Sequence, residues 1–189
     1  MLKIKKINSN DISFSRDLQS HISKRKVNTS DIKEKVRMII SEVKSKRDTA
    51  LVKYSKEYDN YDVQSANELE ISKEECLEAL KKISKEELEA LKFAKSRIQE
   101  FSEHQKAKPW EYTSEGITLG EKVTAIDKVG IYVPGGSAAY PSSVLMNAIP
   151  AKVAGVKRIV MINPGYKGKQ NPAVLYAAKK CKINEIYSI

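Results

Sequence analysis

The chain has 189 residues, of which 41% are hydrophobic and 31% are charged, so it is long enough to bury a core and does not have the composition of a disordered protein. Its apolar runs are short and its first residues hold no sustained apolar stretch, so we expect neither a membrane span nor a secretion signal. The net charge of +10 would suit a nucleic-acid partner. Lysines alternate with glutamates along the predicted helices, however, and the nine tyrosines are scattered, so we expect no nucleic-acid binding.

The two cysteines, Cys76 and Cys181, lie far apart in the sequence. Their spacing fits neither a disulfide framework nor a Cys-x-x-Cys motif. Each lies on the apolar side of a predicted helix, and free cysteine in such a position most often acts as a small buried hydrophobic residue. We therefore expect a reducing, cytoplasmic location.

The first third of the chain is predicted to contain a pair of helices. Ser30 and Asp31 can cap an amphipathic helix that runs to Val43. Asp48 can cap a second helix that runs to Tyr58. The apolar face of this pair needs a partner.

The next segment is predicted to form a short strand and two further helices. The strand is Glu68–Ile71, and two Ser-x-x-Glu capping boxes follow it, Ser72 with Glu75 and Ser84 with Glu87. The second of these helices carries a stripe with helical spacing that should pack on a core. The stripe consists of Leu88, Leu91, Ala94, Ile98 and Phe101.

From Trp110 onward the apolar period changes from helical to two, which predicts a hairpin with Ile117, Leu119, Val123 and Ala125 on one face. Strands and helices then alternate. The predicted order is a strand over Val129–Val133, a helix through Val144, a strand from Arg158, a helix started by Asn171 and Pro172, and a strand over Glu185–Ile189. This βαβαβ order implies parallel strands, and we expect the first of them to be buried on both faces.

The predicted fold class is α/β, with an incomplete doubly wound (Rossmann-like) parallel sheet preceded by a helical N-terminal arm. We divide the chain into residues 1–109, the arm and the helices that pack on the sheet, and residues 110–189, the hairpin and the βαβαβ half of a NAD-binding-like domain. Such a half has unpaired edges and exposed faces. We therefore expect another copy or another chain to cover it.

Ligands of parallel sheets gather at the carboxyl ends of the strands. That rule puts five residues at the rim of any site: Tyr132, Pro134, Gly135, Gly136 and Ser137. The two glycines would let the backbone approach a ligand closely.

The helix after this glycine-rich turn offers free N–H groups to an anion such as a pyrophosphate, and Ser142 or Ser143 can cap it. The turn matches neither G-x-G-x-x-G nor G-x-x-x-x-G-K-[ST]. The residues by themselves leave both phosphate contact and a plain tight turn open.

Four segments of the chain resemble the histidinol dehydrogenase family. They are VKSKRDTALVKYSKEYD at Val43–Asp59, GIYVPGG at Gly130–Gly136, YPSSVLMNAIPAKVAGV at Tyr140–Val156, and RIVMINP at Arg158–Pro164. Two residues depart from the family pattern, because Arg47 and Lys182 stand where the family usually has glycine. We therefore expect the tight helix-to-strand turn at Lys182 to be built differently.

The resemblance implies a zinc- and NAD-dependent homodimeric enzyme of histidine biosynthesis that oxidises L-histidinol through L-histidinal to L-histidine. Tyr132 aligns with a tyrosine that the family uses to bind NAD. The remaining rim residues are further candidates for cofactor binding: Pro134, Gly135, Gly136 and Ser137. The family's zinc ligands and its catalytic Glu-His pair come from a region beyond the equivalent of Ile189, so we assign no catalytic or metal-binding residue in this chain.

Two interpretations follow. In the first, the chain is the N-terminal portion of such an enzyme, truncated before the zinc and catalytic residues. In the second, it is a truncated or split product that only associates, either with itself or with a missing C-terminal half. The only histidines, His21 and His104, lie in polar helical surroundings and are poor zinc ligands under either interpretation.

Overall fold

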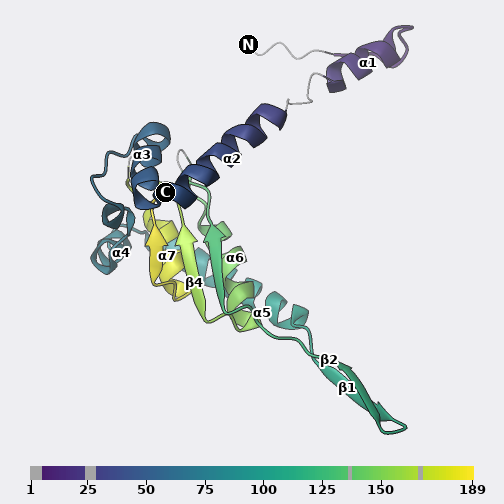
Figure 1. Cartoon of the computed structure of the whole chain (residues 1–189), viewed down its shortest axis with the longest axis vertical. Coiled ribbons are helices and arrows are strands. Elements are labelled where there is room, and N and C mark those ends of the chain that lie inside the picture. Colours follow the sequence, from purple (N-terminus) through teal and green to yellow (C-terminus); the bar gives the residue numbers. More distant parts are fainter. Residues whose placement is uncertain (1–5, 24–28, 136–137, 166–167) are drawn as a thin grey trace. The chain divides into compact units, whose positions relative to one another are not determined.

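The computed structural model describes residues 6–23, 29–135, 138–165 and 168–189 (Figure 1). By its internal contacts the chain divides into two compact units, Met1–Arg47 and Asp48–Ile189. The division predicted between residues 109 and 110 stays a prediction. Among the described residues, no helix is long and apolar enough to cross a membrane.

The first unit contains two helices, α1 (Phe14–Ser23) and α2 (Thr29–Lys46). Helix α2 contains the amphipathic segment predicted from the sequence. None of the described side chains in this unit is buried, so they form no apolar core. Several apolar side chains of α2 are about half exposed: Ile32, Val36, Met38 and Ile40.

The second unit begins with helices. These are α3 (Asp48–Asp59), the 3-10 helix η1 (Ala66–Leu69), α4 (Lys73–Leu80) and α5 (Lys85–Gln105). Both predicted capping boxes are confirmed. At α4 the backbone N–H of Glu75 donates to Ser72 Oγ at 3.1 Å, and the N–H of Ser72 donates to the Glu75 carboxylate at 2.8 Å. The boxes satisfy N–H groups that a helix start leaves free.

The strand predicted over Glu68–Ile71 is wrong. The segment instead begins with the 3-10 helix η1. The Glu68 carboxylate caps its start by accepting hydrogen bonds from the backbone N–H groups of Gln64 and Ser65, at 3.2 and 3.1 Å. Only Glu70 keeps a strand-like pairing, as an isolated antiparallel bridge to Tyr187.

The apolar stripe predicted for α5 is confirmed only in part. Leu91, Ala94 and Ile98 pack against the core. Phe101 instead is 65% exposed, and the next residue, Ser102, is buried with its hydroxyl donating to the Ile98 carbonyl at 2.7 Å. Near the end of α5, the buried face therefore passes through Ser102 instead of the predicted Phe101.

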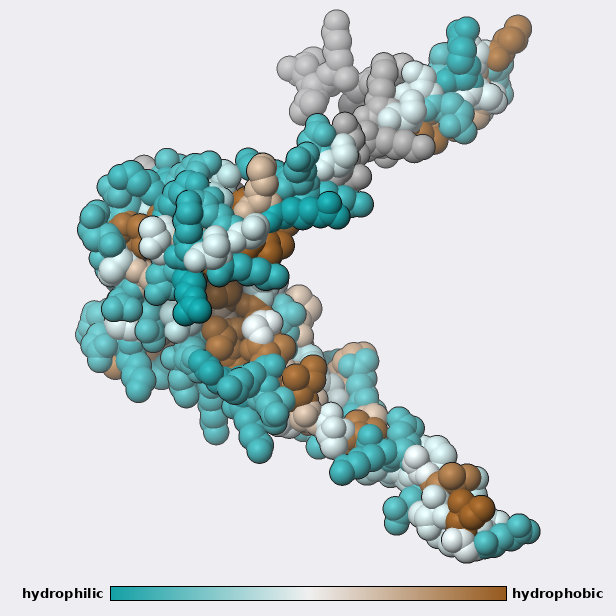
Figure 2. All heavy atoms as spheres, viewed as in Figure 1, coloured by the Kyte–Doolittle hydropathy of each residue, from teal (hydrophilic) through white to brown (hydrophobic). Residues whose placement is uncertain are grey.

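The predicted hairpin is confirmed, with strands β1 (Trp110–Ser114) and β2 (Ile117–Glu121). Its turn residues, Glu115 and Gly116, have φ values of 52° and 78°, as a two-residue hairpin turn requires. The register puts Trp110, Tyr112, Ile117 and Leu119 on one face, and each is more than half exposed. Figure 2 shows apolar side chains on the surface of this hairpin. Val123 and Ala125 lie beyond β2.

A three-stranded parallel sheet forms the centre of the second unit. Its elements are β3 (Lys128–Tyr132), α6 (Pro141–Ala154), β4 (Arg158–Ile162), α7 (Pro172–Lys180) and β5 (Glu185–Tyr187). The strand order is β3-β4-β5, and both neighbouring pairs are parallel (Figure 1). This confirms the α/β fold class with a parallel βαβαβ sheet.

Helices cover one face of this sheet. Ile131, Met161 and Ile186 point into a core shared with α6 and α7. On the other face Lys128, Gly130 and Tyr132 are exposed. Burial of β3 on both faces, as the sequence predicted, is therefore wrong. Two crossovers that advance in the same direction put their helices on the same side of a sheet, so this half of a doubly wound fold covers one face only.

The two outer edges of the sheet differ. Along β5, the backbone N–H of Ile71 donates to the Ile186 carbonyl at 2.8 Å, and the N–H of Ser188 donates to the Leu69 carbonyl at 2.7 Å. The segment after η1 thus covers this edge. In the described part of the chain β3 pairs with β4 alone, so its outer edge is open.

Helices α6 and α7 end in the same motif. At α6 the N–H of Gly155 bonds to the Lys152 carbonyl and that of Val156 to the Ala151 carbonyl, both at 3.0 Å. At α7 the corresponding donors are Lys182 and Ile183. Lys182 has a φ of 54°, as Gly155 has 97°. The expectation of a differently built turn is wrong, because Lys182 adopts the left-handed conformation of a Schellman motif.

Candidate functional site at the carboxyl ends of the strands

A buried asparagine joins the carboxyl ends of the three strands. Asn163, which is 3% exposed, directly follows β4. Its backbone N–H donates to the Tyr187 carbonyl at 2.9 Å, and its side-chain Nδ2 donates to the carbonyls of Val133 at 2.8 Å and Pro134 at 3.3 Å. The side chain of Asn163 thus holds the segment that leaves β3, and its backbone holds the end of β5.

Gln170 extends this network. Its Nε2 donates to the Asn163 carbonyl at 3.0 Å and to Ser188 Oγ at 2.9 Å, while its Oε1 is buried and has no hydrogen-bond partner among the described residues. An unpaired buried oxygen has a free energy cost, so Gln170 offers an acceptor at this end of the sheet. Sequence reasoning missed both Asn163 and Gln170. The signal for Asn163 was a polar residue directly after an apolar strand.

Gly135 is required by the protein's own backbone. A Cβ at this position would collide with the carbonyl oxygen of Pro164. The loops that follow β3 and β4 therefore touch, and only glycine permits this approach. This contact accounts for Gly135 without a ligand.

The predicted rim residues divide into three groups. Pro134 and Gly135 line a cavity of about 280 Å³ between the loops that follow β3 and β4. Tyr132 stands apart from that lining, on the open face of the sheet, where it is 61% exposed and lies opposite Ile162 in the register. Gly136 and Ser137 lie outside the described residues.

The N-terminus of α6 has no side-chain cap. Tyr140 occupies the N-cap position and Pro141 follows it, so the prediction that Ser142 or Ser143 caps this helix is wrong. Proline suits the first helical position, and the helix therefore begins before either serine. Helix α7 differs, because the Asn171 side chain accepts a hydrogen bond from the Ala173 N–H at 2.9 Å, as predicted.

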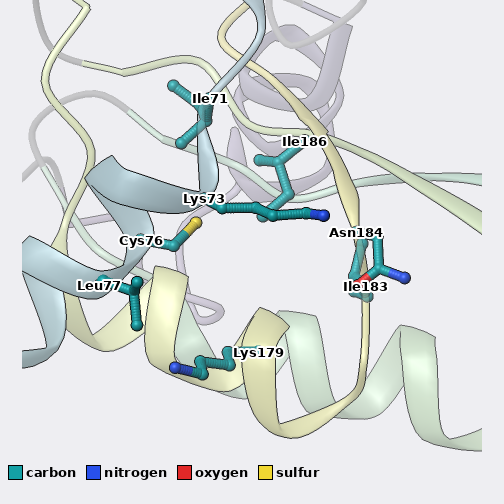
Figure 3. A pocket seen from close by; sticks show the side chains of 8 residues that line it. All are labelled: Ile71, Lys73, Cys76, Leu77, Lys179, Ile183, Asn184 and Ile186. Carbon is teal, nitrogen blue, oxygen red and sulfur yellow. The ribbon is translucent and has the colours of Figure 1, made fainter.

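A second pocket, of about 260 Å³, lies beside the other end of β5 and has a mainly apolar lining (Figure 3). Cys76 and Leu77 of α4 line it together with Ile183 and Ile186, and Lys73 and Lys179 lie on opposite sides of it. Burial raises the pKa of the Cys76 thiol, so the thiolate is disfavoured. Cys76 is therefore not an activated nucleophile.

Groups able to hold a metal ion are not assembled in the described ranges, where no three His, Cys, Asp or Glu side chains converge. His104 lies in the last turn of α5 and is exposed. Burial raises the pKa of the Cys181 thiol as well. The chain thus offers a cavity, a partly free helix N-terminus and an exposed tyrosine, but no acid-base or metal centre among the described residues.

The chain is similar to known proteins over nearly its whole length. The family model described as Histidinol dehydrogenase matches residues 22–189. A histidinol dehydrogenase of Nitrosomonas europaea is 42% identical over 190 residues, which cover 100% of this chain and 44% of that protein. One of Pelagibacter ubique is 46% identical over 187 residues, covering 98% of this chain and 42% of that protein.

A solved structure agrees with these matches. The crystal structure of histidinol dehydrogenase from Elizabethkingia anophelis superposes with a TM-score of 0.79 at 34% sequence identity, covering 86% of this chain and 37% of that one. The chain therefore spans less than half the length of these relatives and corresponds to their N-terminal portion.

Proposed function

The chain belongs to the histidinol dehydrogenase family, and we propose that it supplies the N-terminal part of a zinc- and NAD-dependent enzyme. By family, the reaction is the two-step oxidation of L-histidinol through L-histidinal to L-histidine, in histidine biosynthesis. We also propose a cytoplasmic location and a homodimeric assembly for the complete enzyme.

The observation that carries the proposal is the position of the open edge of β3. The strands run in chain order away from β3, so the direction of a doubly wound sheet would reverse at that edge. Ligands of such sheets bind in the crevice where the direction reverses. Two features border this crevice. Tyr132 lies at the carboxyl end of β3, and the start of α6, which has no side-chain cap, belongs to the crossover that follows β3.

The groups present suit a dinucleotide. Tyr132 exposes a ring that can contact adenine or ribose and a hydroxyl that can form a hydrogen bond. At the N-terminus of α6, Pro141 has no N–H and the Ser143 N–H donates to the Tyr140 carbonyl at 3.0 Å, so the helix offers a pyrophosphate chiefly its partial positive charge. When bound, NAD supplies the acceptor for the hydride of the alcohol. Pro134 and Gly135 shape the turn beside it, and Gly136 and Ser137 stay candidates.

Zinc has no such fit here. No described group of three His, Cys, Asp or Glu side chains converges, so we derive no catalytic step through a metal on these residues. We propose that the metal ligands, the acid-base pair and the contacts to L-histidinol come from the portion of the relatives that this chain does not span. The contribution of this chain is to bind and orient the cofactor.

A second candidate function is association alone. It is favoured by the open edge of β3 and the open face of the sheet, which a separate chain would cover. This chain would then be a catalytically incomplete product whose partner is itself or a C-terminal half. The two candidates differ in whether NAD binds and turns over once a partner is present.

NAD binding tests the role of Tyr132. Calorimetric titration of NAD should show weaker binding to Tyr132→Ala than to wild type, by about threefold to tenfold, since an aromatic contact contributes about 0.5–1.5 kcal/mol beyond area burial. The matched control is Tyr112→Ala, which removes a comparably exposed ring from the hairpin. Equal affinity in wild type and Tyr132→Ala would refute the assignment.

A further inference from the structure

We propose that a basic pocket between α5 and the ends of α6 and α7 binds a small polyanion of the pyrophosphate type. The pocket has a volume of about 300 Å³, which is near the lower limit for small-molecule sites. Helices α6 and α7 end beside it, just before β4 and β5 begin, so it lies at the opposite end of the sheet from Asn163. We expect binding here without the cofactor or another chain.

Positive charge exceeds negative charge in the lining of this pocket. Its four lysines are Lys95 of α5, Lys152 in the last turn of α6, Lys180 in the last turn of α7, and Lys182, which follows α7. The described lining holds one carboxylate, that of Glu103. None of the four lysines forms an ion pair with a carboxylate of the described residues. A phosphate-bearing ligand would neutralise this excess charge.

Two of the lysines lie close to one buried wall of the pocket. That wall includes Cys181, which is 5% exposed. Burial raises the pKa of the Cys181 thiol, and the charges of Lys95 and Lys152 act against that rise. Because such effects weaken with distance, both ammonium groups lie near the sulfur. Lys180 contributes less, since its Nζ lies 5.3 Å from the centroid of the Tyr176 ring.

Lys182 occupies a position that glycine would fit better. Its φ is 54°, and the equivalent position after α6 is taken by Gly155. The left-handed conformation costs a residue with a Cβ free energy, and backbone strain of this kind gathers at ligand sites. The Lys182 side chain lines the pocket, so contact with an anion gives a reason for lysine at this strained position.

Helix dipoles account for only part of the cluster. Lysines in the last turn of a helix are favoured by its partial negative charge, which suits Lys152 and Lys180. Lys95 instead lies near the middle of α5, away from either end. The Schellman hydrogen bonds occupy carbonyl groups at the ends of α6 and α7, which reduces their repulsion of an anion. A bound anion accounts for the lysines that the dipoles do not.

Calorimetric titration of inorganic pyrophosphate into the full chain tests the proposal. We expect one site per chain and an affinity that falls as salt is added, because salt screens exposed charges. Lys182→Gly should weaken binding by about fivefold, the equivalent of about 1 kcal/mol for one exposed ion pair. The same variant should unfold at a higher urea concentration than wild type, so unfolding would not explain its weaker binding. Lys95→Gln should also bind more weakly.

Lys179→Gln is the matched control. It removes the same charge from the last turn of α7, but Lys179 lines the pocket beside Cys76 instead. Its affinity for pyrophosphate should stay within about twofold of wild type, since only screened, long-range charge is lost. Acetylation with acetic anhydride, read by mass spectrometry, locates the ligand. Pyrophosphate should protect Lys95 and Lys182 and leave Lys179 reactive.

Four results would overturn the proposal. The first is no binding of pyrophosphate by wild type at low salt, and the second is equal weakening by Lys182→Gly and Lys179→Gln. The third is wild-type affinity in both Lys182→Gly and Lys95→Gln, which would put pyrophosphate at another site, such as the start of α6. The fourth is tighter binding of citrate than of pyrophosphate, which would assign the pocket to carboxylates.

Discussion

Replacing Lys182 by glycine should stabilise the chain, although it removes a side chain. Lys182 is exposed and sits at a φ of 54° after α7. The left-handed conformation costs a residue with a Cβ roughly 1–2 kcal/mol. Glycine loses about 0.5–1 kcal/mol more backbone entropy on folding. The difference predicts a net gain in unfolding free energy of about 0.5–1 kcal/mol.

Urea denaturation followed by far-ultraviolet circular dichroism measures this gain. With a slope of about 2 kcal/mol per molar urea, the midpoint of Lys182→Gly should rise by roughly 0.3–0.5 M. Lys182→Ala is the matched control, because it removes the ammonium but keeps the Cβ, and it should show no gain. The opposite substitution at the end of α6, Gly155→Ala, should lower the unfolding free energy of the chain by about 1 kcal/mol, since alanine is strained at the φ of 97° of Gly155. A midpoint for Lys182→Gly at or below that of wild type would refute the reasoning.

Three further predictions concern the second unit. Gly135→Ala should destabilise the chain by about 1–3 kcal/mol in the same assay, because the added methyl would force apart the loops after β3 and β4. Arg158 Nε donates to the Glu185 carboxylate at 2.8 Å, and this hydrogen bond lowers the pKa of Glu185. The resulting stability is present above the unfolded pKa of about 4.3 and is lost as pH falls through the lower folded pKa, so Arg158→Gln should lose less stability than wild type in acid titrations. Iodoacetamide should label Cys76 before Cys181, since burial raises the pKa of both thiols and Cys181 is only 5% exposed; equal labelling rates by mass spectrometry would contradict this.

Local signals predicted much of the fold. The capping boxes at Ser72 and Ser84 start helices because their two hydrogen bonds form within four residues of chain. Asn171 and Pro172 start α7 for a similar reason. The switch from helical to alternating periodicity at Trp110 marks the hairpin, whose register depends on a two-residue turn.

Features that depend on distant contacts could not be predicted in this way. Asn163 joins three strands through partners far from it in sequence, and no local pattern names them. The one-sided burial of β3 depends on where two crossovers run rather than on its own residues. Gly135 lines the cavity at this end of the sheet, but its close neighbour is the Pro164 backbone, and its role in cofactor binding stays a prediction. The role of Tyr132 in binding NAD stays a prediction.

The most direct test of the account is histidinol-dependent reduction of NAD, measured with zinc present for the purified chain alone and for its complex with the C-terminal segment of the Nitrosomonas europaea relative. The account predicts no activity from the folded chain alone and NADH formation by the complex. Activity of the chain alone would contradict it, because the metal and acid-base groups would then have to lie within these 189 residues.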